Sequence, residues 1–239
     1  MRDFFKKAFT LGEVLIAMAV IGIVAGLTIP DLVASHREKE IVAKVRKNYA
    51  TLSNVFAQID NETGLKSIVN SGDTAENISE AIAELMKPLL KYDYYCGAND
   101  TTATCAGIRS YGTDTSAFVL NDGTLVEIAD ATLANISPTL HQWAYVAIDL
   151  NGGESPPNAG GWDRFGFLLT ENGLLPIGSP DFSSNASYTF AQCTNFVGLS
   201  RACTAWIVAK GNMDYMKADN TGKCPNGTVL SWDGASSCN

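Results

Sequence analysis

The chain has 239 residues, of which 46% are hydrophobic and 18% are charged, and its formal net charge is −8. This composition excludes a disordered chain and leaves room for one modest domain plus an extended element. Residues 1–64 carry eight Lys/Arg and seven Asp/Glu, whereas residues 65–239 carry nine and eighteen. The second region has a balance of −9, which argues against a surface that binds nucleic acid phosphates.

The N-terminal stretch joins a short basic segment to a long apolar run. Residues 1–8 read MRDFFKKA, and residues 14–30 are 17 positions without a charge. As a helix the run would be about 25 Å long at ~1.5 Å per residue, close to the ~30 Å core of a bilayer. This predicts a membrane helix with a cytoplasmic N-terminus. Two alternatives fit less well, because a cleaved secretory signal has a shorter apolar region and a plain signal anchor leaves the carboxylate of Glu13 unexplained.

One stretch resembles the cleavage and methylation motif of type IV prepilins and type II secretion pseudopilins: Ala8-Phe9-Thr10-Leu11-Gly12-Glu13-Val14-Leu15-Ile16. The resemblance implies that a prepilin peptidase cuts between Ala8 and Phe9, that the new amino terminus is N-methylated, and that Glu13 becomes the fifth mature residue. The family usually has Gly before the cut. Because Ala is the next smallest residue, we expect processing to survive with Ala8.

The resemblance also implies roles in assembly for three residues of the apolar helix. Glu13 would pair with the positively charged amino terminus of a neighbouring subunit, and since an unpaired carboxylate is costly in a low-dielectric bundle, this pairing would select the register of the subunits. Gly22 and Pro30 would bracket a segment that stretches or melts within filaments. The alternative for Pro30 is a simple helix end at the membrane surface.

Beyond Pro30 an amphipathic pattern predicts that the helix resumes and continues to Gly64, which is a typical C-terminal residue. The apolar stripe alternates spacings of four and three: Ile41, Val45, Tyr49, Leu52, Phe56 and Ile59. The charged residues between them indicate a solvated face, with contact to lipid head groups or to acidic filament heads as the alternative. We expect one spine over residues 10–62, roughly 80 Å long at ~1.5 Å per residue.

The remaining chain predicts an α+β head on this spine. We expect a helix over residues 79–90, a hairpin over 117–120 and 124–128, a strand over 143–150, a hairpin over 165–170 and 174–177, and a strand or helix over 204–210. Four or five antiparallel strands would then pack on the long amphipathic helix, as in a type IV pilin. The expected parts are a leader (1–8), a membrane and filament-core helix (9–33), an amphipathic half (34–64) and a globular head (65–239).

The cysteines fall into three close pairs, all beyond the apolar run: Cys96 and Cys105, Cys193 and Cys203, and Cys224 and Cys238. None of them has the Cys-x2-Cys spacing of a zinc site. An even number of cysteines in this position predicts disulfides in an oxidising compartment, with free thiols in a cytosolic protein as the alternative. Six cysteines allow 15 pairings, of which loop length favours the local one. The resemblance likewise implies a C-terminal region closed by a disulfide.

One loop is rich in oxygen ligands, with Asp149, Asn151 and Asp163 as candidate calcium ligands. Major pseudopilins hold calcium in a loop of the head, although the Asn-Gly and Pro-Pro-Asn sequences also suit a plain turn. For catalysis we find no motif, since His141 has no Cys or Ser partner in a recognisable pattern and Gly160-Gly161 lacks the lysine of a phosphate loop. We therefore expect no enzyme and no other cofactor.

These features together lead to an expected function. The chain would be a structural subunit of a type IV pilus or a type II secretion pseudopilus, held by one span in the bacterial inner membrane with its head outside the cytoplasm. It would then enter a helical filament in the periplasm or on the cell surface. Its partners would be other pilin or pseudopilin subunits, the prepilin peptidase, the inner-membrane assembly platform and the lipid bilayer. A minor tip pilin that binds a surface or ligand is the alternative, and an anchored enzyme is a third.

Overall fold

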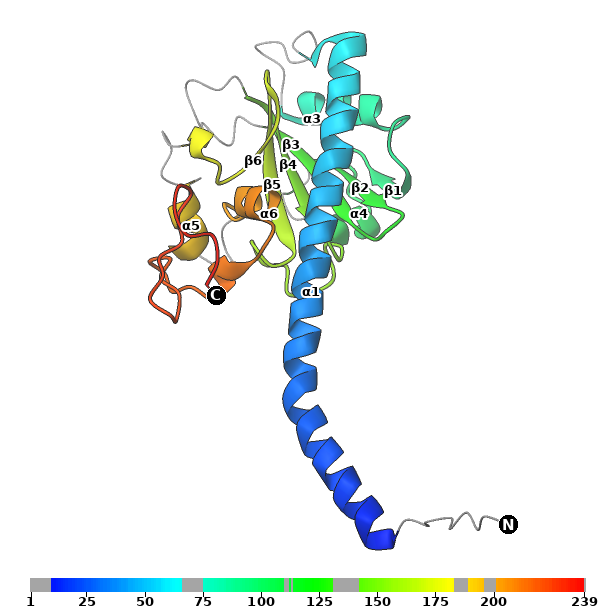
Figure 1. The fold of residues 1–239 in the computed structure, drawn as a ribbon. Helices are drawn as coiled ribbons and strands as arrows, with labels where there is room; N and C mark the ends of the chain where they lie inside the picture. The colour runs from blue at the N-terminus through cyan, green and yellow to red at the C-terminus, as the bar shows by residue number, and fades with distance from the viewer. Residues whose placement is uncertain are drawn as a thin grey trace, which may run out of the picture. The chain divides into compact units, whose positions relative to one another are not determined.

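The computed structural model describes residues 10–65, 75–109, 112, 114–130, 142–182, 189–195 and 201–238. It consists of two compact units, Met1–Glu40 and Ile41–Asn239. The first long element, α1 (Leu11–Thr63), crosses the boundary between them (Figure 1). Each half of α1 is therefore described with the unit to which it belongs.

In the first unit, α1 carries large apolar side chains that are exposed to solvent. Leu11 is 80% exposed and Leu27 is 72% exposed. Among the described residues, α1 is the one helix long and apolar enough to cross a membrane. The helix continues through Pro30. The alternative of a helix end at Pro30 is therefore wrong, because one missing backbone donor interrupts the hydrogen-bond ladder without stopping it.

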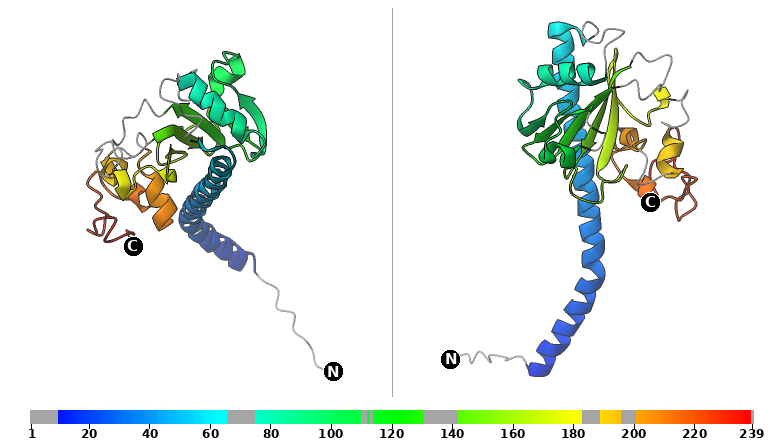
Figure 2. Two further views of the ribbon diagram at one scale, coloured as in Figure 1. Left: turned by 90° about the horizontal axis from the view of Figure 1, so that it is seen from above. Right: turned by 180° about the vertical axis from the view of Figure 1, so that it is seen from behind.

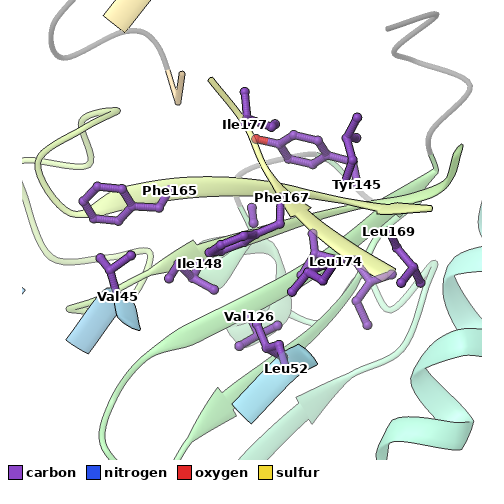
Figure 3. Close-up of a cluster of buried hydrophobic side chains, with 14 of the residues drawn as sticks. Val45, Leu52, Val126, Tyr145, Ile148, Phe165, Phe167, Leu169, Leu174 and Ile177 are labelled. Atoms are coloured by element: carbon purple, nitrogen blue, oxygen red, sulfur yellow. The ribbon is translucent and has the colours of Figure 1, made fainter. Parts of the chain in front are cut away.

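In the second unit, the remaining half of α1 is part of a hydrophobic core. Most of the predicted stripe is buried, with Val45 and Leu52 fully inaccessible to solvent. Figure 3 shows these two side chains pointing toward the sheet, where Phe167 lies among the core residues. The ring of Tyr49 stacks on Phe167 with centroids 5.6 Å apart. The helix ends at Thr63, and Gly64 follows with φ of 72°, a backbone conformation that suits glycine.

The second unit contains a six-stranded antiparallel sheet in which neighbours in sequence are neighbours in space, in the order β1-β2-β3-β4-β5-β6. The strands are β1 (Tyr92–Cys96), β2 (Ser116–Leu120), β3 (Leu125–Asp130), β4 (Gln142–Asp149), β5 (Arg164–Thr170) and β6 (Gly173–Pro176). A long apolar helix with an antiparallel sheet confirms the α+β class at this level. The expectation of four or five strands was wrong, because β1 has the sequence YDYYC and lacks alternating apolar residues.

The large core includes side chains from both faces of the sheet, and a small separate cluster lies on one of them. Phe118 and Val126 belong to the same core as the stripe of α1, together with Ile82 of α3 (Ala75–Met86). Their neighbours in sequence, Ala117 and Leu125, point to the opposite side and form a separate cluster. Helix α3 starts and ends four residues before the predicted 79–90. It stops before Pro88 because proline disfavours helical backbone in the residue that precedes it.

The C-terminal region consists of short helices and loops held by disulfides (Figure 2). The helices are η2 (Pro180–Phe182), α5 (Phe190–Asn195), α6 (Thr204–Lys210) and η4 (Asp214–Met216). Residues 204–210 are thus a helix rather than a strand. The three disulfides are Cys96–Cys105, Cys193–Cys203 and Cys224–Cys238, which are the local pairs expected from loop length. Helix α4 (Ala103–Ile108) lies in the loop after Cys96 and contains Cys105. Both cysteines are buried, although several residues between them are exposed.

Candidate functional site

The start of α1 is the first candidate site. Ala8 and Phe9, the predicted cleavage residues, lie outside the described residues. The first described residue, Thr10, forms a reciprocal capping box with Glu13. The carboxylate Oε2 of Glu13 accepts the N–H of Thr10 at 2.9 Å and its hydroxyl at 2.8 Å, while Thr10 Oγ1 accepts the N–H of Glu13 at 3.2 Å. Our sequence prediction missed this pair, although the Thr-x-x-Glu spacing is the usual signature of such a cap.

The exposed side chains of the first unit form a continuous apolar surface along α1. Thirteen large apolar residues are more than a third exposed: Leu11, Val14, Leu15, Ile16, Met18, Val20, Ile21, Ile23, Val24, Leu27, Ile29, Leu32 and Val33. A Cβ added at Gly22 or Gly26 would meet no atom within 4 Å. Such a surface is unfavourable in water, so it requires lipid or other apolar helices around it.

The candidate calcium ligands lie at the end of β4 and in the loop that joins it to β5, where their side chains already form hydrogen bonds with other protein groups. Asp149 Oδ2 accepts a hydrogen bond from Arg164 Nε at 2.8 Å, and Asp163 accepts the N–H groups of residues 158 and 159 at 2.9 and 2.7 Å. Asn151 Nδ2 donates to the carbonyl oxygens of residues 155 and 156, at 3.1 Å each. Burial raises the pKa of Asp149 despite the hydrogen bond from Arg164, and the nearby charge of Asp163 adds to this rise.

Calcium binding by this loop stays a prediction. Within the part of the chain that the structure describes, no three His, Cys, Asp or Glu side chains are grouped to hold a metal ion. The hydrogen bonds of Asp149, Asn151 and Asp163 explain how the loop keeps its conformation without any ligand.

Arg46 of α1 forms hydrogen bonds with the C-terminal region of the second unit. Its guanidinium donates to the carbonyl oxygen of Val208 at 3.1 and 2.9 Å and to that of Ala209 at 3.4 Å. These carbonyls end α6, where the helix dipole favours a positive charge. Gly211 follows with φ of 73°, and a Cβ there would lie 2.7 Å from Arg46 Nη2. No sequence pattern points to this contact, because the two partners are 162 residues apart.

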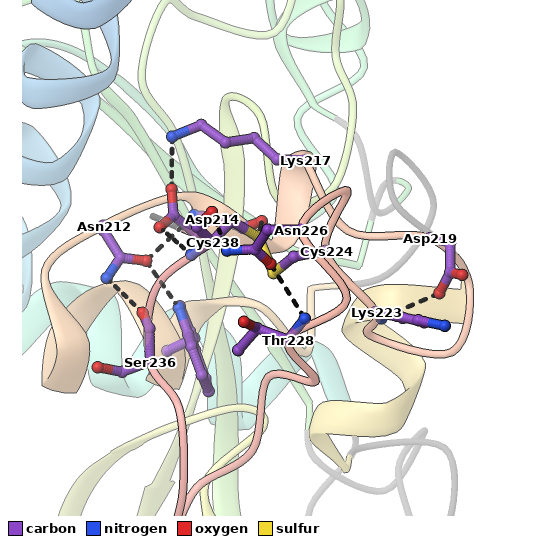
Figure 4. Close-up of a disulfide and its surroundings, with 11 residues drawn as sticks. Asn212, Asp214, Lys217, Asp219, Lys223, Cys224, Asn226, Thr228, Ser236 and Cys238 are labelled. Carbon is purple, nitrogen blue, oxygen red and sulfur yellow. Dashed lines mark hydrogen bonds and ion pairs between the residues drawn. A yellow bond between two sulfur atoms is a disulfide. The ribbon is translucent and has the colours of Figure 1, made fainter.

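The last disulfide lies in a polar network centred on Asp214 (Figure 4). The carboxylate accepts the N–H of Cys238 at 2.8 Å and pairs with Lys217 at 2.5 Å. Asn226 Nδ2 donates to the carbonyl oxygen of Cys238 at 2.9 Å. Burial alone would raise the pKa of Asp214, but the hydrogen bonds from Lys217 and Cys238 outweigh it and lower the pKa below its ordinary value.

Two grooves open at opposite ends of the second unit. One has a volume of about 440 Å³ and includes Lys47, Lys91 and Asp122 in its lining. The other has a volume of about 490 Å³ and includes Asp60 and Glu171. The first lies at the end of β2 and the second at the end of β5. Since β2 and β5 run in opposite directions, these are opposite ends of the sheet.

Comparison of the chain with models of protein families, with curated proteins and with solved structures finds no match.

Proposed function

We propose that this chain is a structural subunit of a type IV pilus or a type II secretion pseudopilus. The observation that carries the proposal is the continuity of three features. The cleavage and methylation motif around Phe9 and Glu13 leads into the exposed apolar half of α1, and the same helix continues into the core of a disulfide-containing head. A subunit of this kind needs one helix that enters both a membrane and a filament core.

The apolar half of α1 would have two successive environments. In the precursor the bilayer would cover it, with the basic leader on the cytoplasmic side of the inner membrane. In the filament, helices of other subunits would replace the lipid. Burying a Val, Leu or Ile side chain stabilises by roughly 1.5–3 kcal/mol, and the small residues Gly22 and Gly26 leave space for close approach.

Glu13 would give the assembly its register. Its carboxylate already accepts two hydrogen bonds from Thr10, which reduces the cost of placing it next to an apolar run. Cleavage between Ala8 and Phe9 would create a positively charged amino terminus four residues away from it. Within a bundle of subunits a charged amine requires an anionic partner, and Glu13 is the nearest carboxylate along the apolar helix.

The head would be exposed to an oxidising compartment outside the cytoplasm. All six cysteines form disulfides, as is usual for proteins of the periplasm and the cell surface. We assign the head a structural role rather than a catalytic one. The interactions found around its polar residues fasten loops to the sheet and to α1.

Mass spectrometry of the mature protein tests the proposal. We expect an N-methylated amino terminus at Phe9 in protein from a host that has a prepilin peptidase, and the unprocessed chain from a strain that lacks this enzyme. An intact Met1 in both strains, or cleavage after the apolar run, would refute the assignment. Electron microscopy of sheared cell-surface and periplasmic fractions from the same strains then shows whether the processed protein is in filaments.

A further inference from the structure

We infer that the two ends of the head bind each other in successive subunits, so that the groove at Lys47 and Lys91 of one copy receives the acidic end of the next copy, at Asp60 and Glu171. The inference rests on the proposed function and adds which surfaces meet. Both ends belong to the second unit, and the side chains that carry the argument are exposed.

The basic groove combines a floor of leucines with two ammonium groups. Leu90 and Leu120 line it and are only 8% and 7% exposed, whereas the side chain of Lys47 is 64% exposed. Lys47 Nζ contacts Asp122 at 2.7 Å and thereby uses one of its three donors. Lys91 is exposed and adds a second positive charge to the lining. The groove therefore offers free ammonium donors above an apolar surface.

The acidic end has the opposite charge. Asp60 and Glu171 are exposed and line the second groove together with the amides of Asn61 and Asn172. Among the described residues that line this groove there is no Lys, Arg or His. Glu171 and Asn172 form the turn between β5 and β6, which exposes both side chains. A hairpin turn with a carboxylate at its tip has a suitable shape and charge to enter a groove with two lysines.

A single molecule cannot make this contact with itself. Lys47 and Asp60 are 13 residues apart on α1, which separates them by about 20 Å at ~1.5 Å per residue, far beyond the reach of an ion pair. Two different surfaces that complement each other form a heterologous interface, and such interfaces repeat into rings or helical filaments. The charge pattern of the head therefore favours the same kind of assembly as the apolar helix, with a second copy of this chain as the partner.

Carbodiimide cross-linking of native filaments tests the contact, because this reagent joins an amine and a carboxylate only where they touch. We expect a cross-linked peptide that joins Lys91 or Lys47 to Glu171. In filaments grown from a mixture of light and heavy isotope-labelled subunits, we expect peptides of mixed label, which identify the bond as one between subunits.

Charge reversal provides the second arm of the test. Lys91→Glu or Glu171→Lys alone should lower filament yield by about tenfold or more, since like charges would then face each other across the interface. The double variant should restore the yield. Asn172→Lys adds a positive charge to the same turn and keeps Glu171 in place, so it should also reduce assembly. Asp233→Lys reverses the charge of an exposed residue that is not part of the lining of either groove, and it is the matched control.

The outcomes separate the inference from the proposed function. Filaments that form without the cross-link, with single variants that assemble normally, would overturn the inference and leave the filament subunit intact. A double variant that stays as defective as the single ones would also contradict the pairing. If the wild-type chain has no methylated Phe9 and forms no filaments, the proposed function fails and this contact fails with it.

Discussion

The two halves of α1 differ in sequence pattern, and the difference follows from what surrounds each half. In residues 11–33 large apolar side chains occur on all sides of the helix, and all thirteen of them are exposed. In residues 41–63 they form one stripe, and the sheet of the same molecule covers it. A helix with one apolar stripe can bury that stripe against one partner, whereas a helix that is apolar all round requires partners on every side. The first half therefore has an exposed apolar surface that requires lipid or other apolar helices around it.

The largest expected effect comes from removing the one carboxylate at the start of the apolar half. Glu13→Ala should leave the protein in the membrane, because the apolar run is unchanged, but it should abolish filaments, because the amine of Phe9 loses its partner. Membrane fractionation and electron microscopy measure the two effects separately. Asp233→Ala, which removes an exposed acid of the head, is the control and should assemble normally. Normal filaments from the Glu13 variant would show that this carboxylate has no role in assembly.

A matched pair of leucine substitutions tests the difference between the halves directly. Leu52 is fully buried and Leu27 is 72% exposed, and both lie on α1. Leu52→Ala should reduce the free energy of unfolding of the head by about 2–5 kcal/mol, because it leaves a cavity in the core. Leu27→Ala should leave the unfolding of the head unchanged in detergent and should affect only assembly. Denaturant unfolding followed by tryptophan fluorescence measures both, and equal losses would mean that the halves are not distinct.

The elements of the fold that depend on the spacing of apolar residues and on turn sequences could be predicted from the sequence. The spine followed from the spacing of Val45, Leu52 and Phe56, and both hairpins followed from apolar runs around Asn-Asp-Gly and Glu-Asn-Gly turns. Strand β1 was missed because its tyrosines are stabilised by neighbours that the sequence alone does not specify, such as Phe118, whose ring lies 4.8 Å from that of Tyr95.

The candidate site likewise combines features that local spacing predicts with contacts that the sequence does not predict. The cap between Thr10 and Glu13 could have been predicted from its three-residue spacing, whereas the contact of Arg46 with Val208 depends on how distant segments meet. The candidate calcium ligands lie at the end of β4 and in the loop that follows it, and their hydrogen-bond partners depend on the path of that loop. Local chemistry is thus readable from the sequence, and contacts over long separations are not.

Arg46 lies just inside the second unit, and its substitution tests how the spine is joined to the C-terminal region. Arg46→Ala should reduce the free energy of unfolding by about 1 kcal/mol, because exposed charged groups at a helix C-terminus contribute about that much. Gly211→Ala should cost about 1–2 kcal/mol through its left-handed backbone and should also displace the guanidinium. Thermal unfolding of both variants, with Asn54→Ala as a control at an exposed position of the same helix, checks the prediction. A larger loss for Asn54→Ala would contradict the role of Arg46.

The smallest expected effect is on how the stability of the head depends on pH. Because hydrogen bonds from Lys217 and Cys238 lower the pKa of Asp214 in the folded chain, the charged carboxylate stabilises the fold. This contribution is fully present above the unfolded value of about 3.9 and is lost as the pH falls through the lower folded value.

Asp149 has a raised pKa, so its protonation acts in the opposite direction as the pH falls. Asp214→Asn should therefore weaken the acid-dependent loss of stability, and Asp149→Asn should strengthen it. Unfolding midpoints measured between neutral and acidic pH, with the disulfides intact, distinguish the two carboxylates, and identical profiles for both variants would contradict the opposite signs.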